Sequence, residues 1–436
     1  MPLRQPETPG LAADTGADLH DALASENEVK DDLPLVSKKF ILVLTLMTFA
    51  GNFAILSPTL FSAAYKVQLI APAQKESVLG LVVGLGAVVT IVTSPIFGLF
   101  TDHTYLRWGK RRPWIAVGIA LCAIGGIGLA FAATIPVLVV TYMVYIAGTA
   151  AIINSVTPVI ADQVPESQRG KIGAFAGVSA QLAGVFGTLA GSALTGNVFL
   201  LFLLPVITAA VIFAVYVFVV PDAPAERKPR EPLSKLAQNL VFNPRRYPNV
   251  GWVWLGRFLL FGGINFYSTY QLYFLLDRLG LTPAEAGQRL ALVGGLGILV
   301  ASGFAVLGGI LSDRLHRRKV FVYLGIVLVA GGLILAAFAH DFWAYALGSL
   351  ILVAGAGVFG SVDQALASEV VPDRSASGRW MSIIGTSGYV PTAIAPLFAP
   401  LILSIGGGSN YLALFLVGAA VTAGAAITTM RVRGVR

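Results

Sequence analysis

Residues 198–220 read VFLLFLLPVITAAVIFAVYVFVV, a run of 23 residues that contains no charged side chain. A helix needs about 20 apolar residues to cross the roughly 30 Å hydrocarbon core of a bilayer. In lipid, a helix also satisfies its own backbone hydrogen bonds. The run therefore predicts a membrane-spanning helix. Eleven further runs of this kind lie at approximately 39–63, 79–101, 113–133, 136–160, 172–195, 251–276, 287–311, 319–339, 342–368, 380–404 and 410–430.

The composition agrees with an all-α membrane protein of twelve transmembrane helices. Charged residues make up 12% and hydrophobic residues 56% of the 436 residues, whereas a soluble domain carries about 25% charged residues. The single cysteine, Cys122, lies in an apolar run, and the four histidines are scattered. We therefore expect no disulfide framework, no metal site and no cofactor.

The basic residues predict the orientation of the helices. If the N-terminus is cytoplasmic, 26 of the 30 lysines and arginines fall in cytoplasmic loops, and only Lys66, Lys75, Arg278 and Arg289 lie on the other side. The positive-inside rule then places both termini in the cytoplasm of a cell-membrane protein. The basic residues are spread over short loops along one membrane face, which argues against nucleic acid as a partner.

A Pro-rich and charged stretch divides the chain into two comparable halves. We expect a disordered acidic tail at 1–37, because this stretch has eight acids and neither the basic start nor the apolar run of a signal peptide. The remaining parts are a six-helix bundle at 38–220, a cytoplasmic linker at 221–250, a second six-helix bundle at 251–430 and a basic tail at 431–436.

The two halves repeat short motifs. The segment Gly98–Asp102 (GLFTD) ends the second predicted helix, and Gly309–Asp313 (GILSD) ends the eighth, 211 positions later. The segment Asp162–Pro165 (DQVP) recurs as Glu369–Pro372 (EVVP) at an offset of 207. Parallel repeats with a solute site between them near the bilayer midplane are a known transporter architecture.

These motifs resemble those of the major facilitator superfamily over about residues 38–430. The superfamily's loop signature G-x-x-x-D-R-x-G-R-R is present in a longer form, similar to that of the sucrose transporter and glycoside–cation symporter branches. Its elements in this chain are Gly98, Asp102, Arg107, Gly109, Lys110, Arg111, Arg112 and Pro113, with a second copy at Asp313, Arg314, Arg317 and Arg318. The resemblance implies two pseudo-symmetric six-helix bundles that move a small solute by alternating access, with a proton or sodium ion as the coupling partner.

The charged loop residues predict a cytoplasmic gate. Asp102 and Asp313 end helices, where the macrodipole disfavours a negative charge, so basic partners in the following loop are expected. The spacing from Asp162 to Arg169 is similar to the E-x6-R of sugar porters, in which such pairs latch the two halves together. Basic residues that only set the topology are the alternative. The predicted gate comprises Asp102, Arg107, Lys110, Arg111, Arg112, Asp162, Arg169, Asp313, Arg314, Arg317, Arg318, Glu369 and Arg379.

Asp363 is the clearest ionisable residue inside a predicted span. It lies six residues before Glu369, which is about 9 Å deeper in a helix. Intramembrane ionisable residues are functional candidates by default, so we predict an ion-coupling or substrate-binding role, with Gln364 beside it. A structural pairing of the carboxyl group with the cytoplasmic gate is the alternative.

Polar residues in several spans are candidates for solute binding. Amide side chains offer both donors and acceptors, and tyrosine rings can stack on a sugar face. Two of them, Gln181 and Asn265, also resemble sugar-porter positions. Hydrogen bonding between helices is the alternative role. The candidates are Asn52, Asn154, Gln181, Asn265, Tyr267, Tyr270, Gln271 and Gln364.

The favoured function is therefore cation-coupled uptake of a sugar or glycoside by a monomer in the lipid bilayer. Export of drug-like compounds or metabolites on the same fold is the main alternative. A polytopic enzyme is disfavoured because the sequence shows no catalytic constellation, phosphate loop or metal spacing. A non-transporting sensor built on a transporter fold is the fourth possibility.

Overall fold

The computed structural model describes residues 34–222, 242–373, 377–406 and 408–432, which are helical and contain no strand. Residues 1–33 of the acidic tail predicted at 1–37, most of the predicted linker and residues 433–436 lie outside these ranges. The first half contains α2 Lys38–Ser57, η1 Pro58–Ser62, α3 Ala63–Ile70, η2 Pro72–Gln74, α4 Lys75–Asp102, α5 Arg112–Phe131, α6 Ile135–Val156, α7 Pro158–Gln163, α8 Glu166–Ala193 and α9 Val198–Val219. The second half contains α11 Pro248–Asp277, α12 Pro283–Leu315, α13 Arg318–Ala337, α14 Phe342–Glu369, α15 Ser377–Leu403 and α16 Tyr411–Arg431.

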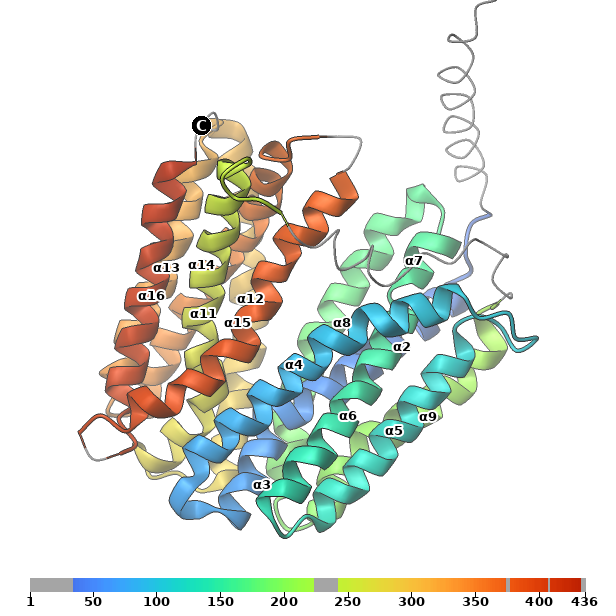
Figure 1. Cartoon of the computed structure of the whole chain (residues 1–436), viewed down its shortest axis with the longest axis horizontal. Helices are drawn as coiled ribbons and strands as arrows, with labels where there is room; N and C mark the ends of the chain where they lie inside the picture. The colour runs from blue at the N-terminus through green and yellow to red at the C-terminus, as the bar shows by residue number, and fades with distance from the viewer. Residues whose placement is uncertain (1–33, 223–241, 374–376, 407, 433–436) are drawn as a thin grey trace, which may run out of the picture.

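Eleven helical segments in these ranges are long and apolar enough to cross a membrane. Helix α11 is the twelfth long helix, with 30 residues. Its apolarity is lowered by Arg257, Asn265 and several neighbouring polar residues. It nevertheless packs lengthwise against α15 and α16 (Figure 1), and the fold is the all-α architecture predicted from the sequence.

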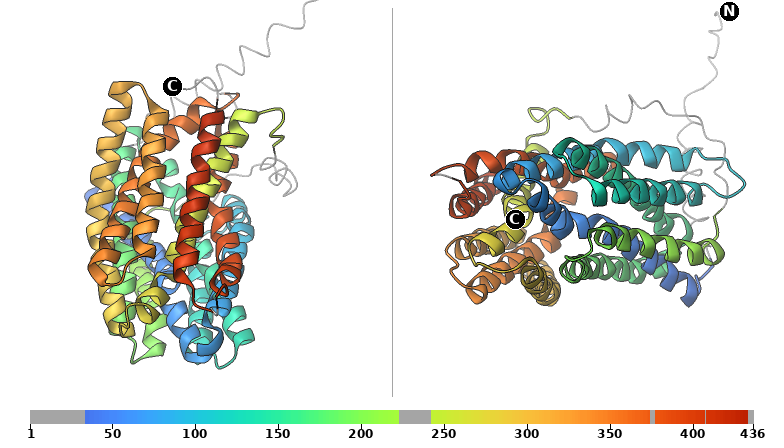
Figure 2. Two further views of the ribbon diagram at one scale, coloured as in Figure 1. Left: turned by 90° about the vertical axis from the view of Figure 1, so that its left-hand side faces the viewer. Right: turned by 90° about the horizontal axis from the view of Figure 1, so that it is seen from below.

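The two halves form separate bundles that meet along two pairs of helices (Figures 1 and 2). Helix α4 packs against α15, and α8 packs against α12. The loop 103–111, α7 and residues 316–317 mark what we call the basic end of the molecule. The other end of the helices carries α3 and the connections 278–282 and 404–410.

Closely packed glycines show the internal symmetry at the level of contacts. Helices α5 and α6 approach through Gly118 and Gly148, where an added Cβ on either residue would lie 2.7 Å or 2.6 Å from the carbonyl oxygen of the other. Helices α13 and α14 approach through Gly325 and Gly355, with corresponding distances of 3.0 Å and 2.7 Å. Each glycine of the second pair follows its counterpart by 207 positions. The two halves therefore share one helix-packing design, and close approach through small residues is a recurrent mode in membranes.

The first span changes its winding beside the centre of the molecule. After Ser57, one turn of π-helix runs over Pro58–Ser62 before α3 continues the rod. A proline has no backbone N–H to donate, and single π-helical turns inside α-helices occur frequently at functional sites. This turn presents Thr59 and Leu60 to the space between the halves.

Candidate functional site

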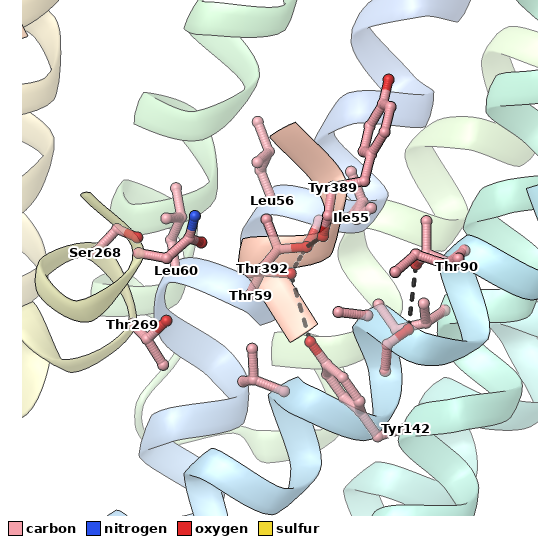
Figure 3. Close-up of a pocket in the computed structure, with 16 residues that line it drawn as sticks. Ile55, Leu56, Thr59, Leu60, Thr90, Tyr142, Ser268, Thr269, Tyr389 and Thr392 are labelled. Atoms are coloured by element: carbon pink, nitrogen blue, oxygen red, sulfur yellow. Dashed lines mark hydrogen bonds between the residues drawn. The ribbon is translucent and has the colours of Figure 1, made fainter. Parts of the chain in front are cut away.

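Two adjoining cavities lie between the halves, on either side of Leu56 and Leu60. The first cavity has a volume of about 240 Å³ and is lined by the π-helical turn and by α4, α6, α11 and α15 (Figure 3). The second cavity has a volume of about 270 Å³ and is lined by α8, α11, α12 and α14. Small-molecule sites typically occupy about 300–1,000 Å³, so the two together could hold a small solute.

The lining of the first cavity is mainly apolar, and its polar groups are hydroxyl and amide groups. Thr59 donates its hydroxyl proton to the carbonyl of Ile55 at 2.6 Å. The Tyr142 hydroxyl, 3.4 Å from Thr59 Oγ1, must therefore be the donor of that pair. The amide nitrogen of Asn265 donates to the carbonyl of Phe261 at 2.8 Å, which leaves its oxygen as an acceptor. The other polar lining residues are Thr90, Ser268, Thr269, Tyr389 and Thr392.

The second cavity has a hydrogen-bonded wall in the second half. The Tyr267 hydroxyl lies 2.6 Å from both the Tyr345 hydroxyl and Ser349 Oγ. Tyr345 in turn donates to the side-chain oxygen of Gln271 at 3.4 Å. Gln181 faces the same cavity from the opposite half. The cavity thus offers an amide on each side.

Half of the predicted solute-binding residues line these cavities. Asn265 lies in the first cavity, and Gln181, Tyr267 and Gln271 lie in the second. The other four do not line either cavity, which corrects their predicted placement: they are Asn52, Asn154, Tyr270 and Gln364.

Each of these four has an identifiable environment. Asn52 and Asn154 donate to carbonyls one helical turn earlier in their own helices, at 2.8 Å in both cases, so these bonds do not join two helices. The buried hydroxyl of Tyr270 donates to the carbonyls of Glu76 and Pro396, where the halves meet. Gln364 is exposed. Periodicity alone could not distinguish these surroundings.

Several cavity residues were missed because they lie in apolar runs. Tyr142 stands among valines, leucines and isoleucines in α6, and Thr59 follows a proline. The proline in the first span was the only sequence signal near them, since it precedes the π-helical turn.

Asp363 lies apart from both cavities, inside the second half. Its Oδ2 is 2.8 Å from Arg257 Nη1, with side-chain exposures of 5% and 11% respectively. The pair bridges α14 to α11 near the basic end. The role of Asp363 in ion coupling remains a prediction. Its carboxylate pairs with Arg257 of α11 and not with a loop residue of the predicted gate.

The predicted gate residues form compact junctions at the basic end. In the first half, Asp162 at the end of α7 pairs with Arg111 and, at 2.8 Å, with Lys110. The side chain of Arg112 donates to the carbonyl of Val220 at 2.7 Å. Asp222 accepts from the backbone N–H groups of Arg111 and Arg112 at 2.8 Å each, which satisfies the start of α5.

The second half repeats this junction. Arg318 pairs with Glu369 at 2.7 Å, and both residues stand 207 positions after Arg111 and Asp162. Lys319, 207 positions after Arg112, donates to the carbonyl of Val432 at 2.6 Å, at the end of α16. The internal repeat thus extends from sequence motifs to individual ion pairs.

The pairing corrects two expectations about the gate. Arg169 does not pair with Asp162: it turns back to the carbonyls of Val164 at 2.9 Å and Ala161 at 3.3 Å, because the chain reverses at the Val164–Pro165 turn. The ion pairs described above also lie within single halves rather than between them.

The remaining predicted gate residues are Arg379 and five residues with exposed side chains. Arg379 lies over the ring of Trp380, 5.7 Å from its centroid. Five others are exposed and make no ion pair within the described residues: Asp102, Arg107, Asp313, Arg314 and Arg317. Their predicted part in the gate remains a prediction.

In the described residues, twelve long helices in two repeated halves, with uncharged and mainly apolar cavities between them, define a two-bundle membrane protein. The sequence profile of the Major Facilitator Superfamily matches residues 40–305 and 298–435, and the chain belongs to this superfamily. The relatives and solved structures that resemble it are transporters.

The curated relatives match only part of this chain, so they do not identify its solute. The chain is 27% identical over 219 residues, 49% of its length, to a probable nitrate transporter NarT of Staphylococcus haemolyticus, and this match spans 53% of that relative. It is 31% identical over 122 residues to the inner membrane transport protein YajR of Escherichia coli, which is 27% of this chain and 26% of that one.

Among solved structures, the nucleoside transporter NupG aligns with a TM-score of 0.74 at 11% identity, covering 91% of this chain and all of that one. A D-xylose–proton symporter aligns with a TM-score of 0.66 at 19% identity, covering 90% and 97%. These likenesses establish the fold.

Proposed function

We propose that this transporter moves an uncharged, hydroxyl-bearing solute of the sugar or glycoside class by alternating access. The observation that carries this proposal is the chemistry of the two cavities. Their polar lining consists of hydroxyl and amide groups, and none of the lining residues is charged.

Uncharged donors and acceptors suit a polyol. The Asn265 oxygen accepts, the amides of Gln181 and Gln271 can do both, and hydroxyl groups offer one donor and two acceptor sites each. Ser268 and Thr269 lie beside Asn265 on the same helix face. Sugar specificity in such a site follows from leaving no buried polar group unpaired.

Nitrate is the second candidate, because the partial relatives include probable nitrate transporters. Burying an anion requires a compensating positive charge or charge-assisted hydrogen bonds. The linings of both cavities contain no arginine or lysine, which favours the uncharged solute. Export of apolar compounds is a third candidate, supported by the many aliphatic side chains in the linings.

We further propose that the basic end faces the cytoplasm and that a proton or sodium gradient drives uptake. The positive-inside distribution supports the orientation. Asp363 supports the coupling only as a candidate, since it lies away from the cavities and is paired with Arg257.

A ligand-stabilisation screen tests the solute class. Purified protein is heated in detergent with sugars and glycosides, nitrate and nitrite, amino acids, or lipophilic cations. A ligand that binds the folded state raises the unfolding midpoint by mass action. We expect a shift with sugars or glycosides that is lost in Asn265→Leu, while the midpoint without ligand stays near that of the native protein.

Uptake of the radiolabelled stabilising ligand into liposomes that contain the protein is then measured, with and without an imposed proton or sodium gradient. Stabilisation by nitrate alone, or by lipophilic compounds alone, would overturn the proposal. Absence of flux for a compound that binds would instead favour a sensor.

A further inference from the structure

Polar side chains link the two halves at the end opposite the basic loops. Five hydrogen bonds cross between the halves here, and one of them is an ion pair. They join the start of α4 and the start of α3 to the C-terminal part of α11 and the start of α16. We call the set Lys75, Glu76, Asp277, Ser409 and Tyr411 the outer latch.

The ion pair is the centre of the outer latch. Lys75 Nζ lies 2.5 Å from Asp277 Oδ1, with side-chain exposures of 13% and 27%. Lys75 is the first residue of α4 and Asp277 is the last residue of α11. Each charge therefore stands at the helix end where the macrodipole disfavours it. Pairing across the halves offsets both unfavourable placements, so the charges stabilise the contact rather than their own helices.

The second carboxylate ties in the start of α16. Glu76 accepts from Ser409 Oγ at 2.7 Å and from the Tyr411 hydroxyl at 3.3 Å. The same hydroxyl lies 2.6 Å from Asp277 Oδ2. The Tyr411 hydroxyl thus lies between the carboxylates of Glu76 and Asp277 and connects them.

Tyr273 adds a further contact between the halves beside the ion pair. Its hydroxyl donates to the carbonyl of Ala64 in the other half at 2.8 Å, and Lys75 Nζ lies over its ring, 5.1 Å from the centroid.

Glycine packing shows that the halves are in close contact near this end. An added Cβ on Gly80 or Gly84 of α4 would lie 2.3 Å or 2.5 Å from α15. At Gly98, near the basic end of the same helix, it would meet nothing within 4 Å. In α8, Gly173 and Gly177 near the basic end are equally open. The helix pairs that join the halves are therefore in close contact near the latch, whereas these three glycines near the basic end have open space beside them.

We infer that the outer latch holds the transporter closed on the side opposite the basic loops, and that breaking the Lys75–Asp277 pair is part of each transport cycle. The ion pairs at the basic end lie within single halves and do not oppose this opening. The inference goes beyond the solute proposal, because it assigns which residues stabilise one of the two conformations.

Thiol labelling tests the inference without any solute, because it measures from which side the cavity is accessible. Cys122 is the only cysteine and is 1% exposed, so Cys122→Ala gives a clean background for Thr269→Cys in the first cavity. A membrane-impermeant thiol reagent is added to each side of sealed vesicles of known orientation. With the latch intact, we expect labelling mainly from the side of the basic loops.

Lys75→Gln and Asp277→Asn should each raise labelling from the latch side about fivefold, the shift that an ion pair of about 1 kcal/mol would give. The charge swap Lys75→Asp with Asp277→Lys should bring the rate back toward that of the native latch. Tyr411→Phe, which removes a single hydroxyl, keeps the test available if a charge variant folds poorly.

Arg278→Gln is the matched control. Arg278 follows Asp277 directly but contacts His340 within its own half, at 3.4 Å, so its removal should leave the labelling unchanged. Unaltered latch-side labelling in Lys75→Gln, Asp277→Asn and Tyr411→Phe would overturn the inference. An equal rise in Arg278→Gln would overturn it too.

Discussion

The buried pair between Arg257 and Asp363 gives the sharpest prediction about stability. The two side chains are 11% and 5% exposed and lie 2.8 Å apart. Removing one partner of such a pair strands the other charge, which typically costs about 3–5 kcal/mol. Asp363→Leu should therefore lower the free energy of unfolding by an amount in this range.

The double variant Arg257→Met with Asp363→Leu should recover most of that loss, because an apolar pair of similar volume replaces a buried ion pair at little cost. The assay is the unfolding midpoint of the purified protein in one detergent, analysed as a double-mutant cycle. Asp313→Leu is the matched control, since Asp313 is exposed and makes no ion pair within the described residues. Its effect should stay within about 0.5 kcal/mol.

Transport by the same double variant distinguishes the two roles of Asp363. If the carboxyl group is only a structural partner of Arg257, gradient-driven uptake should survive in the double variant. If it carries the coupling ion, accumulation should be lost while exchange remains. The structural account is refuted if Asp363→Leu is as stable as the native protein, or if the double variant is no more stable than Asp363→Leu.

Three other experiments test the cavities and the basic end. Tyr142→Phe removes one hydroxyl from the first cavity and should weaken solute affinity about three- to tenfold, the effect of one hydrogen bond, as measured by ligand titration. Gly109→Ala should destabilise by about 1–3 kcal/mol in a thermal midpoint assay, because Gly109 has a φ of +111° and an added Cβ would lie 2.1 Å from a carboxylate oxygen; Gly196→Ala, with nothing within 4 Å, is its control. Arg111→Gln should destabilise more than Arg318→Gln in the same assay, because these side chains are 2% and 27% exposed.

Each of these predictions can fail. Unchanged affinity in Tyr142→Phe would place the solute elsewhere. Equal stability of the Gly109→Ala and Gly196→Ala variants would contradict the strained loop at the start of α5. A larger loss in Arg318→Gln than in Arg111→Gln would contradict the burial argument for the first-half junction.

The helices and their repeat could be predicted from the sequence because lipid imposes a simple rule. Long apolar runs have no alternative to helix in a bilayer, so even α11 was recognised despite Arg257 and its polar centre. The offset of 207 between Asp162 and Glu369 predicted the internal repeat. The structure adds that Arg111 and Arg318 are the partners and follow the same offset.

Partners across loops and across halves could not be predicted, because they depend on how the helices meet. The spacing from Asp162 to Arg169 suggested a pair, but the turn at Pro165 directs Arg169 to backbone carbonyls instead. The outer latch carries no local signal, since Lys75 and Asp277 are 202 positions apart. Tyr142 was hidden for a different reason: one tyrosine in an apolar run predicts burial, not a place in a cavity.

Distance measurements at both ends of the molecule test the central claim, that the two halves tilt about a shared polar site. On a Cys122→Ala background, one spin-label pair is placed at exposed Leu106 and Leu315 near the basic end, and another at exposed Leu69 and Ile405 near the latch. Double electron–electron resonance then compares the native latch with Asp277→Asn. The account predicts that weakening the latch lengthens the Leu69–Ile405 distance and shortens the Leu106–Leu315 distance in the same population of molecules. Distances that stay fixed at both ends, or that lengthen together, would contradict it.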